Sequence, residues 1–155
     1  YLDNLAALLE IGISYAKDKE IEEAVLVNSR LYPNMLPLSR QVQIACDAAK
    51  GAAARLSGIE IPKHEDLETT FEELLARIGK TKIFLKSIKQ ESINNTESKE
   101  ILLKAGPKEF KFIGSQFLTA FALPNLFFHV STAYNILRHS GVDIGKMDYL
   151  GSPPS

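Results

Sequence analysis

The sequence has little of what would assign a chemistry directly. A single cysteine, Cys46, excludes an internal disulfide and favours a reducing cytoplasm. The net charge of −1 gives no electrostatic reason for a nucleic-acid or acidic-membrane partner. No apolar run in the sequence reaches the length that spans a bilayer. We therefore expect a cytoplasmic protein that binds neither nucleic acid nor membrane.

Catalytic motifs are equally scarce. The sequence has no Gly-rich phosphate loop, no nucleophile elbow and no Cys-His pairing motif. Cys46 lies between the apolar face of its predicted helix and the flank of that face, where a cysteine is usually an inert small hydrophobe. Nucleophilic catalysis therefore has weak support, and the sequence leaves open whether the chain is an enzyme.

The composition is that of an ordinary globular domain. Of the 155 residues, 45% are hydrophobic and 24% are charged, which is enough to bury a substantial core. No repeat, low-complexity tract or linker composition divides the chain. We predict one domain over residues 1–151, followed by a disordered tail over residues 152–155.

Apolar residues recur at spacings of three and four, the period of amphipathic helices. A capping-box spacing from Thr70 to Glu73 marks one helix start. The predicted helices span residues 1–17, 20–28, 37–57, 70–90 and 124–139. The economical arrangement is an all-α, antiparallel four-helix bundle.

The pattern changes between the last two helices. Apolar residues at 101–103 and 110–112 flank Gly106-Pro107, which predicts a β-hairpin over residues 100–113 with its apolar side chains turned toward the bundle. A short helical segment should follow over residues 115–122. Pro124 then suits the first turn of the last helix, where its missing N–H costs no hydrogen bond.

The predicted helix over residues 37–57 has two apolar sides. Its main seam consists of Leu38, Val42, Ala45, Ala49, Ala52 and Leu56. A second side carries Ile44, Ala48 and Gly51, and such small residues allow close backbone approach. We expect a homodimer that uses this helix. Asp47 lies opposite the seam, within reach of Lys50 at i+3.

The last helix carries the one histidine expected to face the interior. Leu126, Val130, Ala133 and Leu137 form its apolar stripe, and His129 lies to one side of that stripe. His139 points nearly the opposite way, so the two histidines cannot chelate one ion.

The remaining histidine, Tyr134 and the C-terminal segment are expected to have structural roles. His64 is expected to be exposed in a loop, and Tyr134 to belong to the core or an interface. The tail should dock with Met147, Tyr149 and Leu150 covering one end of the bundle.

The motifs PLSRQVQ, PNLFFHVSTAY and GKMDYLG resemble the uncharacterised family catalogued as domain of unknown function nineteen ninety-three, over roughly residues 1–151. That family is placed in the DinB/YfiT-like metalloenzyme superfamily, whose members are four-helix bundles that commonly dimerise. The resemblance implies this fold and a homodimer. It also implies the superfamily's chemistry, a divalent metal held by three histidines and, in some members, transfer of low-molecular-weight thiols.

The sequence departs from that metal site. His129 matches the first of two ligands a turn apart, but Ala133 stands at the second position. The helix over residues 37–57, which would supply the third ligand, contains no histidine. A catalytic zinc needs about three protein ligands, so no cofactor is expected. The alternative is a weakly bound divalent metal at His129.

His129 keeps three interpretations. It is a hydrogen-bonded structural residue, a polar group that orients a small-molecule ligand in a pocket between helices, or a metal ligand. The leading hypothesis is a small-ligand-binding or non-catalytic homodimer with a degenerate metal site. The alternatives are a metal-dependent thiol transferase and a protein-interaction scaffold that uses residues 44–51.

Overall fold

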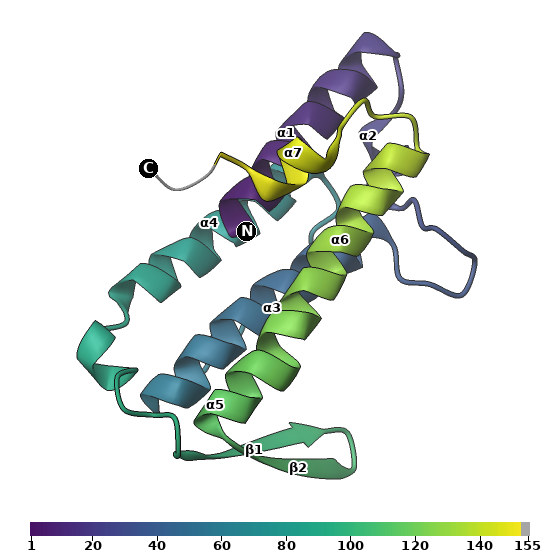
Figure 1. Cartoon of the computed structure of the whole chain (residues 1–155). Helices are drawn as coiled ribbons and strands as arrows, with labels where there is room; N and C mark the ends of the chain where they lie inside the picture. The colour runs from purple at the N-terminus through teal and green to yellow at the C-terminus, as the bar shows by residue number, and fades with distance from the viewer. Residues whose placement is uncertain (153–155) are drawn as a thin grey trace.

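The computed structural model describes residues 1–152, apart from the side chain of Ala105. The protein is mostly helical with one small antiparallel hairpin (Figure 1). Within this described range, no helix is both long and apolar enough to cross a membrane. Residues 153–155, most of the predicted disordered tail, lie outside the described residues. The long helices are α1 (Leu2–Asp18), α3 (Leu38–Ser57), α4 (Phe71–Ser87) and α6 (Leu123–His139).

The four long helices pack around one main core. α3 lies against both α6 and α4, and α1 packs on α4 and α6 (Figure 1). The predicted apolar stripes supply the fully buried side chains of this core. They include Leu5 and Leu9 of α1, Val42 and Ala45 of α3, Leu74 of α4, and Val130, Ala133 and Leu137 of α6. The predicted helix over residues 20–28 is the short α2 (Glu23–Val27).

Local signals set several helix ends where the sequence predicted them. Thr70 Oγ1 accepts from the Glu73 backbone N at 3.2 Å, and the Glu73 carboxylate accepts from the Thr70 backbone N at 3.1 Å. This capping box starts α4. Gly58 closes α3 with a φ of +81°, a left-handed conformation that glycine adopts without strain. α4 ends at Ser87, before the predicted end, and a 3₁₀ turn, η1 (Gln90–Ser92), follows.

The hairpin is formed by β1 (Glu100–Ala105) and β2 (Lys108–Ile113). Ile101 is buried in a small second core with Leu56 and Phe117, and Leu103 is also buried. The expectation that all its apolar residues face the bundle is wrong for Leu102, Phe110 and Ile113, which are 47%, 42% and 43% exposed. Successive side chains of a strand point to opposite faces, so Leu102 points away from the side on which Ile101 and Leu103 are buried. Phe110 lies toward the turn end of the hairpin, which projects beyond the helices (Figure 1).

The last helix does not begin at Pro124. A helical turn, α5 (Gly114–Gln116), and a π-helical segment, η2 (Phe117–Ala122), run directly into α6. Pro124 cannot donate to the preceding turn, and its ring would clash with a regular α-helical carbonyl there. The wider π turn before it is a known way for a helix to accommodate such a disruption. The predicted helical segment over residues 115–122 is therefore continuous with the last helix.

The tail ends in α7 (Lys146–Leu150), which docks through one residue rather than three. The Tyr149 ring lies 5.4 Å from that of Tyr1 and 6.0 Å from that of Tyr134. Tyr134 is a half-buried member of the core, as expected. Met147 is 62% exposed and Leu150 is 43% exposed, so the expectation that they cover the bundle is wrong. A five-residue helix presents only one narrow face to its neighbour.

Candidate functional site

His129 of α6 is buried and is held by Gln41 of α3. The His129 Nδ1 atom lies 2.7 Å from Gln41 Oε1. The Gln41 amide is fixed from its other side, because Nε2 donates to the Leu36 carbonyl at 3.0 Å. Since Oε1 can only accept, Nδ1 carries the proton and donates. Sequence reasoning missed Gln41, although it lies in the motif PLSRQVQ one turn after Leu38.

The surroundings of His129 favour a neutral imidazole. Burial lowers the pKa of His129 below its ordinary value of 6.5. The Phe128 ring stands edge-on to the imidazole, at a centroid distance of 5.1 Å. The structure therefore presents one neutral, hydrogen-bonded histidine between α3 and α6.

The donors near His129 do not fit the three-histidine metal site of the superfamily. Gln41 offers an amide oxygen that already accepts from the histidine, and Ala133 offers no donor. His139 is exposed at the end of α6. Over residues 1–152, no group of three or more His, Cys, Asp or Glu side chains is placed to hold a metal ion.

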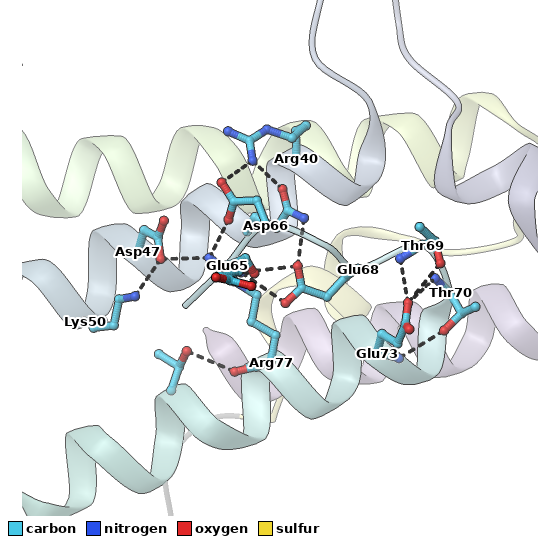
Figure 2. Close-up of polar contacts among 12 residues, drawn as sticks. Arg40, Asp47, Lys50, Glu65, Asp66, Glu68, Thr69, Thr70, Glu73 and Arg77 are labelled. Carbon is cyan, nitrogen blue, oxygen red and sulfur yellow. Dashed lines mark hydrogen bonds and ion pairs between the residues drawn. The ribbon is translucent and has the colours of Figure 1, made fainter. Parts of the chain in front are cut away.

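Arg77 of α4 is the centre of a charged network that the sequence did not reveal (Figure 2). Its side chain is 1% exposed. Nη2 lies 2.9 Å from both Asp47 Oδ1 and Asp66 Oδ1, and Nη1 lies 3.0 Å from Glu68 Oε1. Nη1 also donates to the Glu65 carbonyl at 3.0 Å. One guanidinium thus ties α3 and the loop before α4 to α4 itself.

The surroundings of Arg77 confirm one predicted contact, between Lys50 and Asp47, and show that the predicted exposure of His64 is wrong. Lys50 Nζ lies 2.9 Å from Asp47 Oδ1, the i,i+3 contact expected from spacing. His64 was expected to be exposed, but it is half-buried, because its loop packs toward α4 and shares a pocket of about 410 Å³ with Arg77. Burial, together with the charges of Lys50 and Arg77, lowers the pKa of His64.

Cys46 offers no reactive thiolate. Its side chain is fully buried in the main core. This burial raises the pKa of the Cys46 thiol to about 11, so the thiol stays protonated at neutral pH. Its role is that of a small core residue.

An apolar groove lies beside the second half of α3. One part of it, of about 300 Å³, is lined only by alanine, leucine and isoleucine side chains from α3, η2, α6 and the segment after η1. A second part, of about 340 Å³, extends toward α1 and α4. Ala49, Leu123 and Leu126 line both parts, so the two parts adjoin one another. We call the two parts together the apolar groove.

The groove explains why the predicted seam of α3 is only partly buried. Leu38, Val42 and Ala45 are fully buried, but Ala49 and Ala52 are only half-buried and line the groove. Four of the α3 side chains that line the groove are alanines, and these short side chains leave the space beside α3 open. The run of small residues was the sequence signal for the groove.

Comparisons with known proteins place this fold. A comparison with curated proteins finds no match for the chain. The chain is similar to the crystal structure of a DinB family member protein from Shewanella denitrificans, with 42% sequence identity and a TM-score of 0.91. That alignment covers 99% of this chain and 87% of the other. The family model for a domain of unknown function, DUF1993, matches residues 1–150. The chain therefore belongs to the DUF1993 family.

Proposed function

We propose that this protein is a homodimeric, DinB-like antiparallel four-helix bundle that binds a small apolar molecule in the apolar groove. The observation that carries the proposal is the groove itself. Pockets for small molecules have volumes of roughly 300–1,000 Å³ and are lined mainly by hydrophobic side chains. The groove has this size and this lining. A cytoplasmic location remains a prediction from the single cysteine.

Binding is favoured over thiol transfer by the chemistry of the available groups. Cys46 has a buried, protonated thiol. His129 stands without a second imidazole beside it, and Gln41 occupies its Nδ1. We infer that the ancestral metal site has degenerated, so that a divalent metal would bind only weakly, through His129.

We infer a positioning role for His129. It lies one turn after Leu126, which lines the groove, and its hydrogen bond to Gln41 links α6 to α3. The contact sets the spacing of the two helices whose side chains form the groove. His129 would thus orient the walls of the ligand site rather than react with the ligand.

The groove is tested with a neutral fluorescent probe, N-phenyl-1-naphthylamine, and two matched variants. Ala53→Phe fills the groove, whereas Ala120→Phe adds the same ring at an exposed position of η2. We expect saturable probe binding by the native chain and by Ala120→Phe, and at least about tenfold weaker binding by Ala53→Phe, a change of about 1.4 kcal/mol. Unfolding curves establish that both variants fold. Equal affinity in all three proteins would refute a ligand site in the groove.

The scaffold alternative has a distinct outcome in the same experiment. If the groove were covered by a partner protein or by a second copy of the chain, the probe would bind weakly to the assembled form. Its affinity would then fall as protein concentration rises. A small-molecule site instead keeps its affinity constant across protein concentration.

A further inference from the structure

The two ends of the apolar groove differ in charge. The part toward the hairpin is lined by no charged residue. The part toward α1 and α4 is lined by Asp3, Lys82 and Lys86 as well as by apolar side chains. At the hairpin end, Lys99 donates to the carbonyl oxygens of Arg55 and Leu56, at 3.1 and 2.7 Å, and lies outside the lining. The groove is therefore apolar at one end and charged at the other.

The charged end carries more cations than anions. Lys82 forms an ion pair with Asp3. Asp3, Lys82 and Lys86 line the same end of the groove. The pKa of Asp3 is lowered chiefly by the hydrogen bond from Lys82 and further by nearby positive charges, including that of Lys86. One carboxylate thus faces two ammonium groups. An anion bound there would neutralise the excess positive charge.

We propose that the ligand of the apolar groove is an amphiphile with a carboxylate head and an unbranched hydrocarbon tail. The proposal rests on the ligand-binding function given above. The head lies by Lys86, and the tail runs over Ala49, Ala53 and Leu56 toward the hairpin. The reverse orientation would bury a carboxylate among apolar side chains without a partner, which is costly.

The dimensions of the groove suit a medium-length chain. Leu56 lies seven residues after Ala49 on α3, a rise of about 10 Å at 1.5 Å per residue. Decanoate is a probe of matching length. Decanol has the same tail with a neutral head, and decyltrimethylammonium has the same tail with a cationic head.

Displacement of the neutral fluorescent probe by these three compounds tests the head group. The native chain should bind decanoate tightest and decyltrimethylammonium weakest. Lys86→Glu should weaken decanoate about fivefold, the effect of an exposed charge pair, and leave decanol unchanged. Lys89→Glu, an exposed change outside the groove, is the matched control. Higher ionic strength should reduce the advantage of decanoate over decanol.

Asp3→Asn should have the opposite effect, because it releases Lys82 to meet the head group. Decanoate should then bind more tightly, while decanol stays unchanged. A merely structural role of these residues would move both compounds together.

The two proposals fail differently. Equal displacement by all three compounds would overturn the anionic head group and leave the apolar site standing. No displacement by any of them, together with no saturable probe binding, would overturn the groove as a ligand site.

Discussion

The imidazole of His129 and the amide of Gln41 join α6 to α3 through a 2.7 Å hydrogen bond. Both side chains are buried, at 8% and 2% exposure. Because the amide oxygen accepts, the bond needs a proton on Nδ1 but no positive charge on the ring. The cost of charging a buried imidazole gives this contact a pH dependence.

We predict that folding stability falls as the pH drops from about 7 to about 5. Burial holds the pKa of His129 below 6.5, so the unfolded chain binds more protons than the folded chain in this window. The stabilisation is complete above the unfolded pKa and is lost as the pH falls toward the folded pKa. Urea unfolding across this range should show a shallower pH dependence for His129→Gln than for the native chain.

His64 contributes to the same window with the same sign, because its pKa is also lowered. The difference between native and His129→Gln proteins isolates the part due to His129. His139→Gln, at an exposed position, controls for the loss of a histidine. Identical slopes in the native and His129→Gln proteins would contradict the prediction.

The second prediction is that two substitutions restore a metal site. Gln41→His places an imidazole where the amide now meets His129, and Ala133→His adds one a turn along α6. Three imidazoles match the ligand number of a catalytic zinc site. The double variant should retain near-stoichiometric zinc after dialysis against a weak chelator, as measured by elemental analysis without a histidine tag. The native chain should not.

A control variant separates geometry from histidine count. Gln41→His with Asn135→His also has two added histidines, but residue 135 is exposed on α6. It should bind zinc no better than the native chain. Tightly held zinc in the native chain, lost in His129→Ala, would instead restore the metalloenzyme interpretation.

Sequence patterns predicted those features that depend on residues close together in the chain. Pro37 and Gly58 bracket α3, and the capping box fixes the start of α4, because each depends on residues within a turn of one another. The hairpin also follows from its turn residues. The π-helical entry to α6 was missed, because Pro124 fits a first helical turn equally well.

Long-range contacts were beyond the sequence patterns. Gln41 and His129 are 88 residues apart, and nothing in either helix specifies the other. Periodicity shows that Ala49 and Ala52 lie on an apolar side of α3 but not whether a neighbour covers that side. Arg77 is a charged residue between Leu74 and Ile78 on α4, and its burial depends on carboxylates brought in by a separate loop.

The third prediction concerns Arg77. Arg77→Met should lower the free energy of unfolding by about 3 kcal/mol, because it leaves the carboxylates of Asp47, Asp66 and Glu68 close together without their shared cation. Arg40→Met is the matched control, since Arg40 pairs with Asp66 at a site where both side chains are more than a third exposed. Its effect should stay below about 1 kcal/mol. Denaturant unfolding measures both, and equal small losses would show that the buried network adds little.

The last prediction concerns the outer face of α3 and α6. Ile44 and Ala48 of α3 and Phe121 of η2 line a shallow pocket of about 200 Å³. Phe128, two turns after Phe121, is 57% exposed. A symmetric dimer uses the same patch on both copies, so an aromatic knob beside a shallow pocket suits a self-complementary interface.

We therefore predict a dimer at micromolar concentration that is weakened at least about tenfold by Phe128→Ser and by Ile44→Glu. The first variant removes a large apolar contact, and the second replaces an apolar side chain of the outer face, outside the apolar groove, by a charge. Ile83→Ser is the matched control, because Ile83 is a 71% exposed apolar residue on α4. Sedimentation velocity over a concentration series measures the association constant. A monomeric native chain would refute the dimer, and a dimer unaffected by both variants would place the interface on another face.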